Sequence, residues 1–203
     1  DNDTSFTDSQ IARFDSVLGN LQRAGIETGW VHIANSAATL RRADAHRDLV
    51  RVGIAMYGIA PDTSMDSMCS NLRQALSLKS RVSFIKKVSA GEGISYGQRY
   101  QVREVTRIAT IPLGYADGVP RRLSAVGGEV LIADQRFPIV GRVTMDQLMV
   151  DIGSSPIVVG DEVVLLGSQG QERITPNDWG QVLETIGYEI VCGLSARLGR
   201  VYR

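Results

Sequence analysis

Hydrophobic and polar positions follow two patterns along the chain, and the change between them falls near residue 70. The first pattern begins with apolar residues that recur every three to four positions from about Asp8 to Ala24, behind a candidate N-cap at Thr7. This spacing predicts an amphipathic helix, which Gly25 ends. Its apolar face comprises Ile11, Phe14, Val17, Leu18 and Leu21.

Two short apolar runs follow this helix, Trp30–Ile33 and Leu49–Ile54, and the small residues Ala34–Ala38 between them suit a turn that opens a helix. Strand, helix and strand at this spacing are typical of βα units in a parallel sheet or barrel. Two such units cannot close a barrel, so we expect more of it upstream. The polar segment Ala60–Ser67 predicts a linker.

After the linker, short β-branched runs alternate with Gly and Pro, which predicts an antiparallel β domain. The predicted strands are Ala75–Val88, Val105–Pro112, Glu129–Ala133, Phe137–Val140, Gln147–Ile152 and Glu162–Gly167. Near the end of the chain, Thr175 and Pro176 predict a helix that runs to about Ile186.

Composition excludes several classes of protein. The 22 basic residues equal the 22 acidic ones, so charge gives no reason to expect nucleic acid or an anionic membrane as a partner. No apolar run approaches the roughly 20 residues of a membrane span, and the polar, acidic start is not a secretory signal. We expect a cytoplasmic protein, and the lack of an initial Met indicates a fragment or a processed product.

The two cysteines, Cys69 and Cys192, lie far apart without the spacing of metal ligands. We expect buried thiols in a reducing compartment and no metal site.

Candidate chemistry in the first part lies where the predicted strands end. Ser36 follows a strand at a helix start, where free N–H groups favour an anion such as phosphate; the alternative is a plain turn with Ser as the N-cap. Arg51 adds a cation at a strand end, and Gly53 permits close backbone approach. The alternative for Arg51 is a surface ion pair.

In the second part, Tyr96 places a phenol on a glycine-flanked loop, although such a tyrosine is also explained as a packed aromatic residue. Two further segments, Gly114–Gly118 and Gly141–Gln147, mix glycine, charge and an aromatic or Met residue at strand ends. Structural ion pairing is the competing explanation for each of their charges.

Taken in order, these motifs resemble those of the alanine racemase family, over essentially the whole chain. The matching motifs are His32-x-Ala34-Asn35-Ser36-Ala37-Ala38, Val50-Arg51-x-Gly53-Ile54-Ala55-Met56-Tyr57-Gly58, Ser95-Tyr96-Gly97, Pro112-Leu113-Gly114-Tyr115-Ala116-Asp117-Gly118, Gly141-Arg142-x-x-Met145-Asp146-Gln147, and Tyr188-Glu189 before Arg197-x-x-Arg200-Val201-Tyr202.

The resemblance implies an α/β plus all-β chain: the C-terminal part of a (β/α)₈ barrel followed by an antiparallel β-barrel-like domain. Residues 1–65 would be the last βα units of the incomplete barrel, and residues 66–203 the C-terminal β domain. It also implies an isomerase that interconverts L- and D-alanine with pyridoxal 5'-phosphate, supplies D-alanine for peptidoglycan, and works as a head-to-tail homodimer with shared active sites.

The resemblance further assigns roles to single residues. Ser36 and the backbone N–H groups of Gly53 and Ile54 would bind the cofactor phosphate, and Arg51 would face its ring nitrogen. Tyr96 would reach across the dimer and exchange a proton at the substrate α-carbon. The N–H of Met145 would contact the substrate carboxylate. The remaining candidates resemble the polar lining of the substrate corridor: Tyr115, Arg121, Arg142 and Asp1.

The chain also departs from the family pattern. The cofactor-binding lysine lies early in the family's first half, whereas Lys79, Lys86 and Lys87 all fall in the predicted β domain. We therefore expect this stretch to be inactive alone. Ala196 stands where some members have a phosphate-contacting tyrosine, which leaves serine open as a substrate. One alternative is therefore the racemase domain of a membrane-bound serine/alanine racemase. A non-catalytic module for dimerisation or binding is the other alternative, and an unrelated binding domain of similar architecture is a third.

Overall fold

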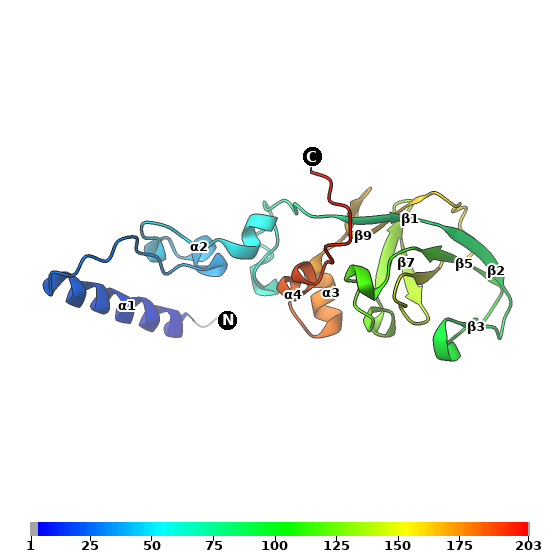
Figure 1. Cartoon of the computed structure of the whole chain (residues 1–203), viewed down its shortest axis with the longest axis horizontal. Helices are drawn as coiled ribbons and strands as arrows, with labels where there is room; N and C mark the ends of the chain where they lie inside the picture. The colour runs from blue at the N-terminus through cyan, green and yellow to red at the C-terminus, as the bar shows by residue number, and fades with distance from the viewer. Residues whose placement is uncertain (1–3, 203) are drawn as a thin grey trace. The chain divides into compact units, whose positions relative to one another are not determined.

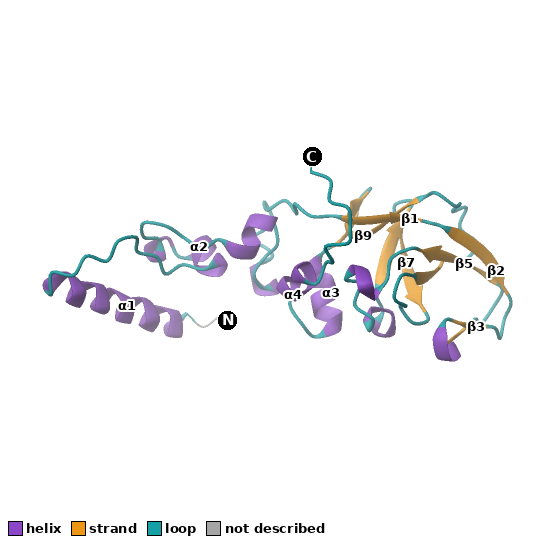
Figure 2. Ribbon diagram, in the orientation of Figure 1, coloured by secondary structure: helices purple, strands orange, loops and turns teal. Residues whose placement is uncertain are grey.

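The computed structural model describes residues 4–202 and divides into two compact units, one up to Arg73 (unit 1) and one from Gln74 (unit 2) (Figures 1 and 2). None of the helices described in this range is both long and apolar enough to cross a membrane. Together the units form a mixed α/β chain, with helices and loops in unit 1 and most of the strands in a curled antiparallel sheet in unit 2.

Unit 1 is helical and irregular. Its elements are α1 (Ser5–Arg23), α2 (Ser36–Arg41) and the 3₁₀ helices η1 (Ala43–Ala45), η2 (Gly53–Tyr57) and η3 (Thr63–Met65). The predicted cap of the first helix at Thr7 is wrong. Helical bonding begins where the Asp8 N–H donates to the Thr4 carbonyl at 2.8 Å, so Thr7 already lies in the first turn. Ile11 is buried on the apolar face, whereas Val17 is exposed.

The two strands predicted in unit 1 are also wrong, because both runs are irregular and the second leads into η2. The runs nevertheless lie beside each other and point in the same direction. The Asp48 N–H donates to the Val31 carbonyl at 3.1 Å, and a second bond of 2.9 Å joins residues three positions further along both segments, Arg51 and Ala34. Two isolated bonds do not make a ladder, since strand formation depends on pairing with neighbouring strands and not on local sequence alone.

Unit 2 is built on an eight-stranded antiparallel sheet with the order β1-β9-β6-β7-β8-β5-β2, and β10 also pairs with β9. The strands are β1 (Leu78–Arg81), β2 (Phe84–Val88), β5 (Thr106–Ile111), β6 (Glu129–Ile132), β7 (Gln135–Val140), β8 (Leu148–Asp151), β9 (Glu162–Gln169) and β10 (Glu172–Ile174). The single predicted strand Ala75–Val88 is therefore two strands, β1 and β2, at opposite ends of the strand order.

Because β1 and β2 are joined by only Val82 and Ser83, the two ends of the sheet must meet. The Val82 N–H donates to the Asp161 carbonyl, next to β9, and the Ser83 N–H donates to the Thr110 carbonyl in β5, each at 2.9 Å. The chain thus passes from one edge of the sheet to the other within two residues. The sheet curls on itself, as its ribbon shows (Figure 1).

Two short helices, α3 (Pro176–Leu183) and α4 (Gly187–Cys192), complete the core of unit 2. Four consecutive residues of β9, Val163–Leu166, are buried, so both faces of this strand are covered. Trp179 of α3 and Ile190 of α4 belong to the same apolar cluster.

The cap of α3 at Thr175 is confirmed by its reciprocal hydrogen bonds with Asp178. The helix ends three residues earlier than predicted, because Glu184 adopts a left-handed conformation. Cys192 is exposed at the end of α4, so the expectation of a buried thiol is wrong there and right for Cys69.

A short hairpin, β3 (Gly93–Ile94) and β4 (Tyr100–Gln101), was not predicted. It packs on the sheet through Ile94 and Val102, which form a small apolar cluster with residues of β2, β5 and β7. Its two-residue strands are too short to give an alternating pattern in the sequence.

Candidate functional site

The predicted phosphate-binding residues of unit 1 gather where α2 begins. Asn35 caps this helix, since its Oδ1 accepts a hydrogen bond from the Ala38 N–H at 3.0 Å. Ser36 is therefore the first helical residue and not the N-cap. Its side chain is buried, and its Oγ donates a hydrogen bond to the Val52 carbonyl. This bond holds the start of α2 against the segment that leads into η2.

Gly53 is required where these two segments meet. Its φ is +57°, and a Cβ at this position would lie 2.8 Å from the Ser36 Oγ. Gly53 and Ile54 begin η2, so their N–H groups have no acceptor within that helix. The structure thus brings together the hydroxyl and the two backbone groups that the sequence singled out. We call Ser36, Gly53 and Ile54 the cradle.

Arg51 lies next to the cradle in sequence and is held by a histidine. One Nη lies 2.7 Å from the His32 Nδ1, and the other donates to the Ile33 carbonyl at 3.3 Å. A guanidinium can only donate, so the Nδ1 must accept and the imidazole must carry its proton on Nε2. The alternative that Arg51 forms a surface ion pair is not what the structure shows, because Arg51 contacts a ring nitrogen and a carbonyl.

Five other predicted residues surround one cavity of about 370 Å³ in unit 2, which we call the Tyr96 cavity. Its lining contains Tyr96, Tyr115, Arg121, Arg142 and Met145, together with Val143, Thr144, Asp146 and Gln147. The residues come from three separate segments: the β3–β4 connection, the stretch that includes η5 (Tyr115–Asp117), and the loop between β7 and β8. Two phenols, two guanidinium groups and a loop backbone thus line the same space.

Tyr96 lies at the tip of the β3–β4 hairpin, in the 3₁₀ turn η4 (Tyr96–Gln98), and its side chain is exposed. The residue before it, Ser95, has φ 64° and ψ −176°. The Ser95 Oγ donates a hydrogen bond of 2.8 Å to the Arg142 carbonyl in the β7–β8 loop. Two segments of the cavity lining are therefore joined directly.

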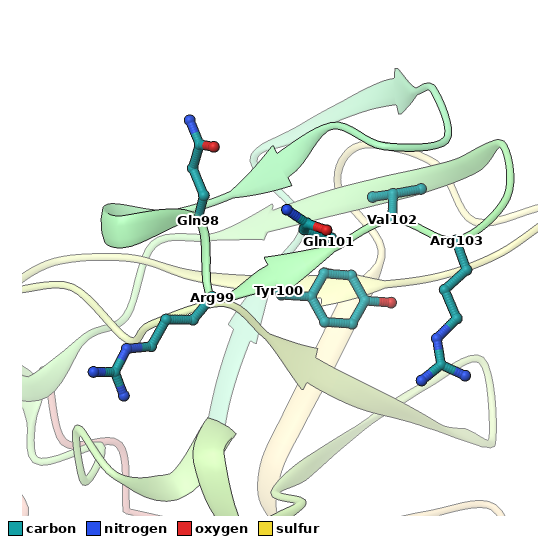
Figure 3. A pocket seen from close by; sticks show the side chains of 6 residues that line it. All are labelled: Gln98, Arg99, Tyr100, Gln101, Val102 and Arg103. Carbon is teal, nitrogen blue, oxygen red and sulfur yellow. The ribbon is translucent and has the colours of Figure 1, made fainter.

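A second tyrosine on the same hairpin is held quite differently. The Tyr100 hydroxyl donates to the Asp151 carboxylate at 2.7 Å, and Thr106 donates to the other oxygen of that carboxylate at 2.5 Å. Burial, and then the bond to Asp151, raises the pKa of Tyr100 to about 12. Its ring lies between Arg99 and Arg103, on a separate cavity of about 550 Å³ (Figure 3). Tyr100 is thus held in the structure by Asp151, whereas Tyr96 lines the Tyr96 cavity.

The loop that carries Met145 is held by backbone contacts with η5. The N–H groups of Tyr115 and Ala116 donate to the carbonyls of Thr144 and Met145, each at 3.0 Å. Within the loop, the N–H and hydroxyl of Thr144 both donate to the Gln147 carbonyl at 2.9 Å. The cavity side of this loop is therefore fixed by its neighbours.

An ion triad adds a second link between the same segments. The Arg197 Nε lies 2.9 Å from Oδ1 of the buried Asp117, and its Nη2 lies 2.6 Å from Oδ1 of Asp146. The other oxygen of Asp117 accepts from the Gly114 N–H at 2.9 Å. The bond to Asp146 raises the pKa of Arg197 further above its ordinary value, so this guanidinium stays charged.

Sequence reasoning gave no role to His32, Asp117 or Arg197, although all three stand inside the motifs that it quoted. These three residues could have been noticed only because they stand inside the motifs. What each one contacts could not be predicted, because its partners lie far away in the sequence. Asp1 lies outside the described residues. Lys79 forms an ion pair with Glu162 at 2.7 Å on the sheet of unit 2.

Comparison with protein families assigns both parts of the chain to the same family. The model described as "Alanine racemase, N-terminal domain" matches residues 1–61, and the model described as "Alanine racemase, C-terminal domain" matches residues 75–202.

Individual relatives agree with this. The chain is 49% identical to an alanine racemase of Carboxydothermus hydrogenoformans, over 98% of this chain and 54% of that protein. It is 42% identical to an alanine racemase of Nostoc, over 98% of this chain and 51% of that protein. The chain thus spans about half the length of the curated relatives it matches.

Solved structures give the same result. The alanine racemase of Bacillus anthracis with bound L-Ala-P superposes with a TM-score of 0.93 at 42% identity, over 99% of this chain and 52% of that one. The alanine racemase of Clostridium difficile in complex with cycloserine gives a TM-score of 0.90 at 39% identity, over 98% and 52%.

Proposed function

The chain belongs to the alanine racemase family, and on that premise we propose that it contributes half of an enzyme that interconverts L- and D-alanine with pyridoxal 5'-phosphate. The observation that carries the proposal is the Tyr96 cavity, where two tyrosines, two arginines and the Met145 loop converge. In the proposal, residues 1–65 are the last βα units of a (β/α)₈ barrel, and residues 66–203 are the family's C-terminal β domain. The D-alanine would be made in the cytoplasm for peptidoglycan.

Substrate recognition is assigned to the rigid side of the cavity. A backbone N–H is a good donor to a carboxylate, and the Met145 loop is fixed by the η5 contacts and the ion triad. Arg121, Arg142 and Tyr115 would line the path by which a small zwitterion enters. Relatives were solved with L-Ala-P and with cycloserine bound, and both fit the expectation of a small amino-acid ligand.

Tyr96 is assigned the proton transfer at one face of the α-carbon. Its phenol is exposed at a hairpin tip, which suits a residue that serves the active site of the partner subunit in a homodimer. Arg121 and Arg142 line the same cavity and would place positive charge beside the reacting groups.

The cradle fits a cofactor phosphate. A Cβ at Gly53 would occupy the space beside the Ser36 Oγ, and the adjacent N–H groups of Gly53 and Ile54 are donors of the kind that bind phosphate oxygens. The six residues of α2 give only a small helix dipole, so these donors and not the helix supply the affinity. To bind phosphate, the Ser36 hydroxyl must turn its proton away from the Val52 carbonyl.

Arg51 fits the ring nitrogen of the same cofactor. When bound, the cofactor withdraws electrons from the substrate and so acidifies its α-proton. A guanidinium can only donate a hydrogen bond, so Arg51 would bind the ring nitrogen in its unprotonated form and would limit that withdrawal. A limited electron sink favours simple proton exchange over transamination. His32 orients the guanidinium for this task through the 2.7 Å contact.

The lysine that tethers the cofactor is assigned to residues outside these 203. The three lysines of the chain, Lys79, Lys86 and Lys87, lie on β1 and β2 and outside the motifs that resemble those of the family. Ala196, next to Arg197, favours serine as a second candidate substrate, since a small residue leaves room where other members carry a tyrosine.

The test is expression of the complete reading frame, with D-alanine formed from L-alanine measured by chiral chromatography. Tyr96→Phe should lower turnover strongly and unequally in the two directions. Tyr100→Phe, the control on the same hairpin, should retain turnover because Tyr100 bonds Asp151 and lines a different cavity. Lack of racemisation by the wild type, or equal and slight losses in both directions for Tyr96→Phe, contradicts the proposal.

The chain alone gives a second test. Mixed with pyridoxal phosphate and treated with borohydride, it should retain no cofactor after gel filtration. Cofactor fixed to Lys79, Lys86 or Lys87 would overturn the assignment of the tether.

A further inference from the structure

Ser95, the residue before Tyr96, has a backbone conformation that belongs to glycine. Its φ of 64° and ψ of −176° lie in a region that residues with a side chain almost never adopt. The neighbouring glycines, Gly93 and Gly97, show that this hairpin uses glycine freely. The most demanding position nevertheless carries serine.

Contacts from the β7–β8 loop hold Ser95 in this conformation. Its Oγ donates to the Arg142 carbonyl at 2.8 Å. Gly141, with φ +68°, lies so close that a Cβ there would be 2.8 Å from the Ser95 Cβ and 2.9 Å from the Ile94 carbonyl. On the other side, the buried side chain of Ile94 anchors the hairpin to the sheet. The strained residue is thus fixed between the core and a neighbouring loop.

We propose that Ser95 is a positioning residue: its strained backbone, held by the Arg142 carbonyl, directs the Tyr96 phenol and couples it to the loop that carries Met145. The hydroxyl explains why serine stands here. Only a residue with a short donor can both make the bond to Arg142 and remain in this turn, and the bond offsets the backbone strain. The catalytic part of this inference rests on the proposed function, and the structural part does not.

A turn selected for stability alone would carry glycine, and this contrast separates the two explanations. Ser95→Gly removes the strain and the hydroxyl together, so the strain relief compensates the lost bond and the fold keeps its stability. The hairpin tip, however, gains conformational freedom, and the phenol is no longer fixed. If Ser95 has only a structural role, stability and turnover should change together in Ser95→Gly. If Ser95 positions Tyr96, this variant should keep its stability and lose turnover.

The experiment uses the protein from the complete reading frame, loaded with cofactor, in four forms: wild type, Ser95→Gly, Ser95→Ala and Ser83→Ala. Ser83 is a matched control, because its Oγ also donates to a carbonyl, that of Thr110, at 2.9 Å and outside the Tyr96 cavity. The measurements are the urea midpoint, kcat and KM for both enantiomers, and amide hydrogen exchange at residues 94–98.

For Ser95→Gly we expect a urea midpoint like that of the wild type, faster amide exchange at Tyr96 and Gly97, and kcat lower by roughly tenfold to a hundredfold with little change in KM. In D₂O, one enantiomer should gain α-deuterium without inversion more often than in the wild type, because Tyr96 fails to deliver its proton. Ser95→Ala keeps the strain and loses the bond, so both midpoint and kcat should fall. Ser83→Ala should keep its kcat.

A wild-type kcat in Ser95→Gly overturns the inference, as does a loss of kcat matched by an equal loss in Ser83→Ala. If the wild type does not racemise alanine, the proposed function fails and amide exchange decides the structural part. Unchanged exchange at Tyr96 and Gly97 in Ser95→Gly then overturns it, and faster exchange there supports it.

Discussion

Replacing Arg197 with Met is expected to destabilise unit 2 because it leaves a buried carboxylate without its cation. The Asp117 side chain is 6% exposed, and without Arg197 its carboxylate keeps the Gly114 N–H, at 2.9 Å, as a donor. Removing one partner of a fully buried ion pair costs about 3–5 kcal/mol. The Arg197 side chain is itself 50% exposed, so solvent screens the pair, and the cost that remains is that of an under-bonded buried carboxylate at Asp117, about 1–3 kcal/mol.

The second contact of Arg197 adds little. Both Arg197 and Asp146 are about half exposed, and exposed pairs contribute at most about 1 kcal/mol. We therefore expect the cost of Arg197→Met to come from the Asp117 carboxylate that it leaves without a cation, and to exceed the cost of breaking an exposed ion pair. Lys79→Met is the matched control. It breaks a pair in which both side chains are about 40% exposed, and its cost should stay under about 1 kcal/mol.

Urea unfolding followed by tryptophan fluorescence measures this change in unit 2. Trp179 is buried in its core, whereas Trp30 of unit 1 is largely exposed, so the change in emission reports mainly on Trp179. Asp117→Asn keeps an oxygen for the Gly114 N–H and removes the charge. Combined with Arg197→Met it should cost less than the sum of the two single changes, by about 1 kcal/mol or more. Additive changes, or a loss in Arg197→Met no larger than in Lys79→Met, would refute the reasoning.

Three further predictions concern other parts of the molecule. Gly53→Ala should lower the free energy of unfolding of unit 1 by about 1–2 kcal/mol and speed amide exchange around Ser36, because the new Cβ would clash with the Ser36 Oγ and alanine disfavours a positive φ. Unchanged amide exchange around Ser36 would contradict the cradle. Wild-type stability should fall as the pH rises from about 10 to 12, since the unfolded chain releases the Tyr100 proton near pH 10 while the folded chain holds it to a pKa of about 12. Tyr100→Phe lacks this contribution, so the difference in unfolding free energy between the two proteins should shrink over that range, and a constant difference would contradict it. In the complete enzyme, Arg51→Glu should impair racemisation and raise transamination, and an unchanged product ratio counts against the limited electron sink.

The sequence predicted best those features whose causes are local. The cap of α3 follows from Thr175 and Asp178, which satisfy each other's backbone groups within one turn. The antiparallel strands of unit 2 could be predicted from the short β-branched runs. The break between β1 and β2 could not, because residues 82–83 continue the mixture of apolar and polar residues on either side of them. The runs from Trp30 and Leu49 have the composition of strands and remain irregular, since a strand requires a ladder that the run itself does not encode.

The candidate site shows the same division between local and distant causes. Sequence motifs identified the groups that face the Tyr96 cavity, because a phenol, a guanidinium or a glycine is visible as a letter. The acceptors that position those groups are backbone carbonyls, at Arg142, Thr144 and Met145. Every residue has a carbonyl, so no residue type marks the ones that matter.

Only the fold decides which carbonyl meets which donor, and here it brings together segments that lie in different hairpins and loops. The bond from Ser95 to Arg142 is the clearest case, because it depends on the backbone carbonyl of Arg142, a residue that also lines the cavity. Side-chain changes at Arg142 therefore leave the bond possible, whereas changes at Ser95 remove it. The geometry of this site is thus held largely by main-chain atoms, and its chemistry is supplied by the side chains that those atoms position.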